Sequence, residues 1–131
     1  MPSMIPDLQA SFVCEDVRVE ASGSHTIVGI INGIGAPSLP VRLLKFCVWT
    51  RWCSGSGRFT QLTKIVYPDE DKTLVHATTE FTLGDQDSHV TNVNIFAGLE
   101  FGDEGIYHVE ISLDDELKLR YPLRVFVPPL S

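Results

Sequence analysis

Acidic side chains gather in the turns of this chain, where their oxygens could hold a hard cation. Two triads stand at the predicted ends of the domain: Asp69, Asp71 and Asp103, and Asp85, Asp87 and Asp114. If consecutive strands run up and down, alternate turns share an end, which would bring the members of each triad together. Ca²⁺ prefers clustered carboxylate and carbonyl oxygens. Aspartate is also common in turns because its side chain hydrogen-bonds local backbone. Both triads therefore remain candidates, and we predict no bound metal or cofactor.

Histidine and cysteine offer two further possibilities. His76 and His108 point outward from predicted strands and could share a metal, although such a site needs three or four ligands. The simpler interpretation is two solvated imidazoles. Cys53 borders a Gly/Ser-rich stretch at residues 54–57 and could serve as a nucleophile, but no motif supplies the histidine base that such a thiol needs. We therefore predict no catalytic residue and a protein that is not an enzyme.

Three residues are candidates for binding a protein partner: Arg51, Trp52 and Phe126. Arg and aromatic side chains concentrate binding energy at interfaces. The alternative around Arg51 and Trp52 is core packing of one tryptophan, with the other residues covering the surface. Phe126 falls on the outward face of a C-terminal strand that Pro122 places at a sheet edge. An exposed edge phenylalanine beside the apolar arm of residues 1–6 predicts a homodimer with two-fold symmetry.

Composition excludes several classes of partner. The 131 residues suffice for one domain with its own core. A net charge of −7 argues against nucleic-acid binding, which needs a basic patch, and against docking on anionic membranes. The three cysteines, without a C-x-x-C motif, predict free and mostly buried thiols in a reducing compartment. We find no signal-peptide pattern and no apolar run that could span a membrane, and so expect a cytoplasmic location.

A central strand over residues 41–53 is expected to organise the fold, because it is apolar on both faces and free of Gly and Pro. Alternation and turn signals predict seven more strands, at residues 8–17, 25–34, 59–67, 72–83, 89–97, 106–113 and 117–127. We expect Val93 and Ile95 to point inward, and residues 54–57 to form a hairpin loop. The prediction is one all-β domain over residues 1–131, an antiparallel β-sandwich with an extended arm at residues 1–6.

Two resemblances accompany this pattern. Residues 103–107, DEGIY, resemble the D-x-G-x-Y of the tyrosine corner in immunoglobulin-type sandwiches. This implies an immunoglobulin-like sandwich in which the Tyr107 hydroxyl bonds to nearby backbone, and Trp49 on the central strand fits the same architecture. Val109 stands where antibody domains have a cysteine. Over its whole length the chain also resembles a family of small bacterial single-domain proteins of unassigned function, through CEDVR at 14–18, Gly23, IVGII at 27–31 and GIYHV at 105–109.

The second resemblance implies no activity, so the functional prediction depends on the residues. A non-catalytic protein-binding or structural module that can self-associate through an edge strand is the first prediction. The alternative is a sandwich that binds a small molecule or carbohydrate, with or without the help of Ca²⁺. The identity of the partner or ligand is open at this point.

Overall fold

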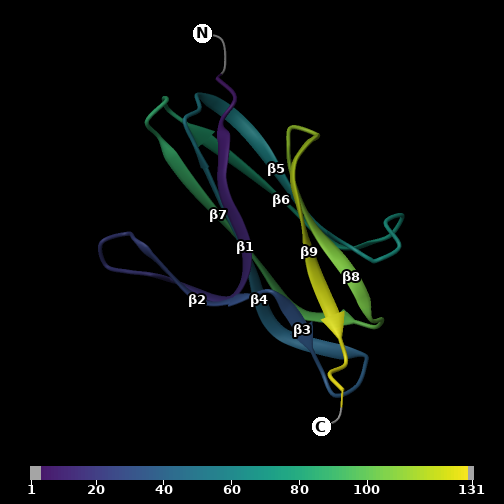
Figure 1. Cartoon of the computed structure of the whole chain (residues 1–131). Coiled ribbons are helices and arrows are strands. Elements are labelled where there is room, and N and C mark those ends of the chain that lie inside the picture. The colour runs from purple at the N-terminus through teal and green to yellow at the C-terminus, as the bar shows by residue number, and fades with distance from the viewer. Residues whose placement is uncertain (1–3, 130–131) are drawn as a thin grey trace.

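Two β-sheets pack face to face in the computed structural model, which describes residues 4–129 (Figure 1). Within those residues the chain forms nine strands: β1 (Asp7–Val19), β2 (His25–Ile31), β3 (Gly33–Gly35), β4 (Val41–Cys53), β5 (Gly57–Val66), β6 (Thr73–Leu83), β7 (His89–Phe101), β8 (Gly105–Leu113) and β9 (Glu116–Phe126). The four-stranded sheet has the order β2-β1-β4-β7, and the five-stranded sheet has the order β3-β9-β8-β5-β6. The predicted all-β sandwich is confirmed, with nine strands instead of eight. None of the described residues forms a helix that could cross a membrane.

Strand β4 has the bounds predicted for the central strand and lies between β1 and β7. Its inward side chains Phe46, Val48 and Trp52 are fully buried in the main core between the sheets. Its other face carries Cys47 and Trp49, which are buried in a second, smaller cluster on the outside of the four-stranded sheet. A strand that is covered on both faces needs apolar residues at both parities. This double burial covers residues 46–50 and explains why the alternation is lost there, whereas Leu44, earlier in the strand, is 89% exposed.

Strand β8 follows the predicted alternation closely. Tyr107, Val109, Ile111 and Leu113 are all buried, as expected for the inward face. The Tyr107 hydroxyl donates a hydrogen bond to the backbone oxygen of Asp103 at 3.0 Å, so the backbone contact predicted for this tyrosine is present. Burial raises the pKa of Tyr107, which keeps its hydroxyl protonated and able to donate. The contact fastens the β7–β8 loop to the start of β8.

A hydrogen-bonded network crosses the core between the two sheets. Trp52 Nε1 donates to Gln61 Oε1 at 2.7 Å, and Asn92 Nδ2 donates to the same oxygen at 2.9 Å. Gln61 Nε2 donates to Thr63 Oγ1 at 2.7 Å, and that hydroxyl donates to Asn94 Oδ1 at 2.7 Å. All five side chains are buried. Because buried polar groups are costly when unpaired, the mutual satisfaction of these groups permits a polar layer inside an apolar core.

This network explains a wrong prediction on β7. The inward side chains there are Asn92 and Asn94, not Val93 and Ile95, and Ile95 is 61% exposed. Hydrophobicity places Val and Ile inside, but the amides of Asn92 and Asn94 find partners on β5. The register of β7 against β4 fixes the result, because Asn94 lies opposite the buried Val48.

Two predicted connections also differ from the structure. Residues 25–34 form two strands in different sheets, because β2 pairs with β1 whereas β3 pairs in parallel with β9. Residues 54–57 do not form a hairpin loop, because β4 and β5 belong to opposite sheets. The stretch carries the chain across the sandwich instead, with a left-handed φ of 61° at Ser54.

Candidate functional site

The acidic turns do not assemble a metal site. Among residues 4–129, no group of three His, Cys, Asp or Glu side chains is placed to hold an ion. Asp69 and Asp103 do line one hollow of about 400 Å³, as expected for turns at the same end, but Lys72 lines it too and Asp71 does not. The calcium-assisted version of ligand binding therefore has no site in the described part of the chain.

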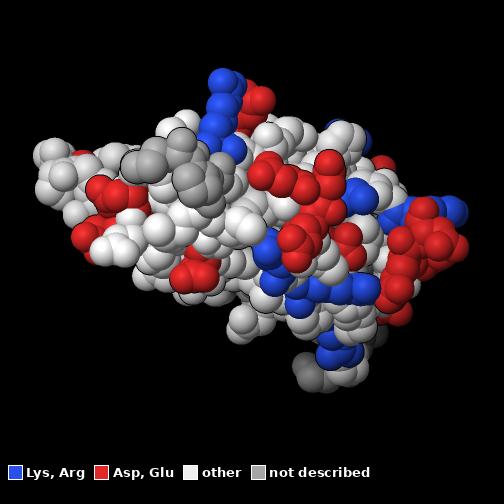
Figure 2. All heavy atoms as spheres, turned by 90° about the horizontal axis from the view of Figure 1, so that it is seen from above, with Lys and Arg blue, Asp and Glu red and all other residues white. Residues whose placement is uncertain are grey.

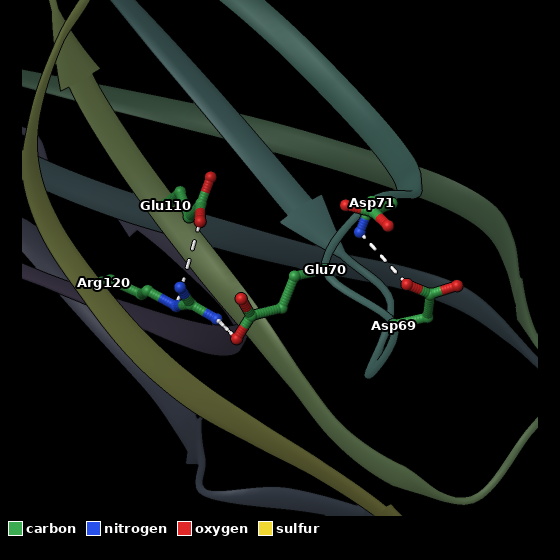
Figure 3. A network of polar contacts seen from close by, with 5 residues as sticks. All are labelled: Asp69, Glu70, Asp71, Glu110 and Arg120. Atoms are coloured by element: carbon green, nitrogen blue, oxygen red, sulfur yellow. Dashed lines mark hydrogen bonds and ion pairs between the residues drawn. The ribbon is translucent and has the colours of Figure 1, made fainter.

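The carboxylates of the first acidic turn are used for local structure. Asp69 Oδ1 accepts a hydrogen bond from the Asp71 backbone N–H at 3.3 Å (Figure 3). Glu70, between them, pairs with Arg120 Nη2 at 2.5 Å, and Arg120 Nε lies 3.8 Å from Glu110 Oε2 (Figure 3). Arg120 thus ties the β5–β6 turn to the outer face of β8 and β9. Asp69 and Glu70 are therefore turn and surface-pair residues.

The second triad is likewise used in hydrogen bonds within the protein. Asp85 Oδ1 accepts from the Asp87 backbone N–H at 2.9 Å, and Ser88 Oγ donates to the same oxygen at 3.0 Å. Local hydrogen bonding of this kind is the ordinary reason for aspartate in turns. Asp114 instead makes a tertiary contact, because its Oδ1 accepts from the Thr60 backbone N–H at 2.8 Å and joins the β8–β9 turn to β5.

The two candidate histidines are separated, whereas two of the cysteines lie opposite each other. β5 lies between β6, which carries His76, and β8, which carries His108, so the two imidazoles are not on neighbouring strands. Cys14 lies directly opposite Cys47 in the β1–β4 ladder, and the two are free thiols. Burial raises the pKa of Cys14 to about 11 and raises the pKa of Cys47. Because the thiolate is the reactive form of cysteine, both act as packing residues.

The two tryptophans exchange the places expected for them. Trp52, a candidate for partner binding, has no exposed surface and bonds to Gln61 inside the core, so that prediction is wrong. Trp49, the expected core tryptophan, lies on the outer face of the four-stranded sheet, stacked on Phe12 with ring centroids 4.8 Å apart. Their spacing of three residues puts them on opposite faces of one strand. Sequence alone does not say which parity faces the other sheet.

Phe126 is half-buried, and the β9 edge on which it was predicted to be exposed is partly covered. β3 pairs with residues 124–126 of β9, and the Phe126 ring packs on Gly33 and Gly35. The Arg124 guanidinium lies 4.9 Å from the ring centroid, a cation–π contact. The premise of an open β9 edge is therefore wrong. Of the predicted arm, residues 1–3 lie outside the described part, and Met4 pairs with Ser56.

The opposite edge of the five-stranded sheet is formed by β6, which we call the β6 edge. β6 has 11 residues and pairs on one side only, with β5. Its sequence, TLVHATTEFTL, contains no Gly, Pro, Lys or Arg. No backbone–backbone hydrogen bond to its other side occurs within residues 4–129.

Arg51, the remaining candidate, lies on the outer face of the four-stranded sheet at the rim of a hollow. The tip of the β1–β2 hairpin, the end of β4 and the start of β7 enclose this hollow of about 480 Å³. We call it the Arg51 hollow; it is lined by Ser22, Gly23, Ser24, His25, Trp49, Arg51, His89 and Thr91. Trp49 Nε1 donates to His25 Nδ1 at 3.1 Å and so holds the hairpin against β4.

Charge is mixed over the surface that Figure 2 shows. Acidic and basic side chains are interspersed there, and broad areas carry neither. Among the ion pairs of the molecule, Lys45 Nζ lies 2.7 Å from Asp16 Oδ1, and this hydrogen bond lowers the pKa of Asp16 and raises that of Lys45. Seen from this side, the molecule has no continuous basic surface of the kind that nucleic-acid binding requires.

A comparison with protein families gives a match that spans nearly the whole sandwich. The model of a family of unknown function covers residues 9–126, from within β1 to the end of β9. No curated protein matches the chain. The family supplies no activity, substrate or partner, so the functional argument depends on the geometry.

Proposed function

Because this chain belongs to DUF6941, a family of unknown function, we propose a role from its geometry: a non-catalytic protein-binding module that pairs with a second copy of itself through the β6 edge. The observation that carries the proposal is a long edge strand without Gly, Pro, Lys or Arg that, beyond a bulge at residues 73–75, pairs in regular register over residues 75–83. Exposed backbone N–H and C=O groups on such an edge are a template for another strand.

We also infer that the sandwich is of the immunoglobulin-like class. The order β9-β8-β5-β6 faces β1-β4-β7, and Tyr107 makes its backbone contact at the start of β8. Variable-type immunoglobulin sandwiches likewise extend one sheet by additional strands at the side where β6 lies here. The class carries no function by itself, but it identifies β6 as the strand that ends the larger sheet.

The other three sheet edges carry features that discourage pairing. β9 has Pro122 and is covered over residues 124–126 by β3. β2 is seven residues long and contains Gly29 with a φ of 66°. β7 contains Gly98 with a φ of 67°, which interrupts a regular extended edge. By contrast, the described backbone of β6 contains no residue with positive φ. The comparison leaves β6 as the edge best suited to a partner.

The side chains of β6 suit an antiparallel pairing of two copies about a two-fold axis at Thr78. In that register His76 of one copy lies opposite Glu80 of the other, and Val75 lies opposite Phe81. An imidazole N–H can donate to a carboxylate across the ladder, and an aromatic–β-branched pair also stabilises antiparallel strands. Because each pair occurs twice, the edge is self-complementary, as an isologous dimer requires. The ten strands of two five-stranded sheets would then form one continuous sheet.

Light scattering at micromolar concentration tests the proposal. We expect a dimer of the 14.5 kDa chain and a monomer for Thr78→Lys. Thr78 is exposed on the outer face of β6, so the substitution leaves the core intact. At the two-fold axis it places two like charges opposite each other, which destabilises a ladder.

Thr26→Lys is the matched control. Thr26 is an exposed threonine on β2, an edge strand of the other sheet. Thr26→Lys adds the same charge to a strand of the other sheet, away from the β6 edge, so it should leave the dimer intact. A monomeric wild-type chain, or equal loss of the dimer in both variants, would contradict pairing through the β6 edge.

A further inference from the structure

The Arg51 hollow lies on the outer face of the four-stranded sheet, in the other sheet from β6. Two strands contribute to it at neighbouring register positions, since Arg51 lies opposite Thr91 and Trp49 opposite Val93 in the β4–β7 ladder. The turn at the tip of the β1–β2 hairpin closes one side with Ser24. Segments far apart in the sequence thus converge on one concave surface, which is the usual form of a small-ligand site.

Hydrogen-bond donors are directed into this hollow. Trp49 Nε1 can only donate, so His25 Nδ1 is the acceptor in their 3.1 Å hydrogen bond. The proton of the neutral His25 ring is therefore on Nε2, which is free to donate to a ligand. Ser22 Oγ donates to Ser24 Oγ at 3.1 Å, which leaves the Ser24 hydroxyl proton available as well.

Arg51 adds a positive charge without a counter-ion. Its Nε is shielded from solvent and has no hydrogen-bond partner, and no carboxylate lies within ion-pair distance of Arg51 among residues 4–129. The guanidinium is therefore not neutralised by a carboxylate of the described residues, and an anion in the hollow would supply that counter-charge.

The lining contains no acidic residue, although the chain has 17 Asp and Glu against 10 Lys and Arg. The residues of the hollow present one guanidinium, two imidazoles and hydroxyl groups, and the carboxylates of this protein are in other places. An arrangement of donors without acceptor charges is complementary to an oxyanion.

We propose that the Arg51 hollow binds the phosphate group of a small phosphate monoester. Donors reach the hollow from three directions: the hairpin (Ser24 and His25), β4 (Arg51) and β7 (His89 and Thr91). A tetrahedral phosphate presents several acceptor oxygens to such a set, whereas a carboxylate presents two in one plane. Arg binds phosphate with its planar fork of N–H groups. The volume of about 480 Å³ leaves room for the organic part of the ligand.

Titration of the full-length chain with inorganic phosphate at constant ionic strength tests the site. The reporter is the Trp49 indole N–H resonance, because that group is bonded to His25 at the wall of the hollow. We expect saturable shifts in roughly the millimolar range, since inorganic phosphate lacks the organic part of the ligand. Arg51→Gln and His89→Gln should each weaken binding, the former by about tenfold or more.

Arg42→Gln is the matched control for charge. Arg42 is also on β4, but it is exposed and pairs with Glu100 at the far end of the strand. The Arg42→Gln variant should bind phosphate with the affinity of the wild type. As a control for the ligand, succinate should bind to the wild type more weakly than phosphate does. The proposal is overturned if phosphate gives no saturable shift, if Arg51→Gln and Arg42→Gln lose equal affinity, or if succinate binds better. His89 is exposed, so His89→Gln tests the site even if Arg51→Gln fails to fold.

Discussion

The two edges of the five-stranded sheet are built in opposite ways. At the β9 edge, β3 pairs with the last residues of the strand, Phe126 covers Gly33 and Gly35, and Pro122 removes a donor. At the β6 edge, the ladder with β5 is regular over residues 75–83, beyond a bulge at residues 73–75, and none of the described residues covers its outer side. Protection of a sheet edge is thus local in this fold. One side of the sheet is closed by short-range contacts, and the other is unpaired among the described residues, as the proposed pairing of two copies requires.

The protection of the β9 edge depends on close approach of side chain and backbone. A Cβ atom at Gly35 would lie 3.1 Å from the Phe126 ring, and one at Gly33 would lie 3.0 Å from the Arg124 carbonyl oxygen. Glycine at both positions lets β3 lie flat against the end of β9. Arg120 adds ion pairs to Glu70 and Glu110 on the outer face of the same region (Figure 3), although exposed pairs contribute little.

Phe126→Asp breaks the protection of the β9 edge and should lower the free energy of unfolding more than Tyr107→Phe does. The half-buried ring loses its packing on β3 and its contact with Arg124, so we expect a loss of about 2 kcal/mol in the free energy of unfolding, less than for a fully buried phenylalanine. Urea denaturation measures it, with Phe126→Leu as the milder control. Light scattering should still show a dimer. A dimer that dissociates on Phe126→Asp while surviving Thr78→Lys would place the contact at β9 instead.

Tyr107→Phe weakens the anchoring of β8, the strand with which β9 pairs. The substitution removes the hydroxyl that bonds to the Asp103 carbonyl at 3.0 Å and leaves the buried ring in place. We expect a cost of about 1 kcal/mol, the usual net value of one hydrogen bond, and no change in association. Thermal unfolding measures the loss. A variant that melts with the wild type would show that this contact does not stabilise the start of β8.

The sequence predicts those parts of the fold in which one rule acts alone. Alternation in residues 106–113 places Tyr107, Val109, Ile111 and Leu113 correctly, because one face of β8 is buried and the other is solvated. Apolar residues at both parities of 41–53, without Gly or Pro, predict β4 with its observed bounds, because a strand covered on both faces, as β4 is over residues 46–50, has no reason to alternate.

Prediction fails where tertiary contacts override hydrophobicity. Asn92 and Asn94 point inward because Gln61 and Thr63, about thirty positions away, supply partners. The exchange of Trp49 and Trp52 has the same origin, since either parity of β4 is apolar enough for the core. The Arg51 hollow could be suspected only from Arg51 itself, because Ser24 and His25 approach it through the folding of the hairpin, and His89 through the pairing of β7 with β4.

Amide hydrogen exchange on β6 at two protein concentrations is the most direct test of pairing through the β6 edge. Alternate N–H groups of β6 point away from β5, so they are exposed to solvent in a monomer and bonded in a β6–β6 dimer. Pairing through the β6 edge predicts that these amides exchange slowly at high protein concentration and rapidly on dilution. The exchange rates of the amides of β2, β7 and β9 should not change. Concentration-independent exchange on β6, or new protection on β9, would contradict it.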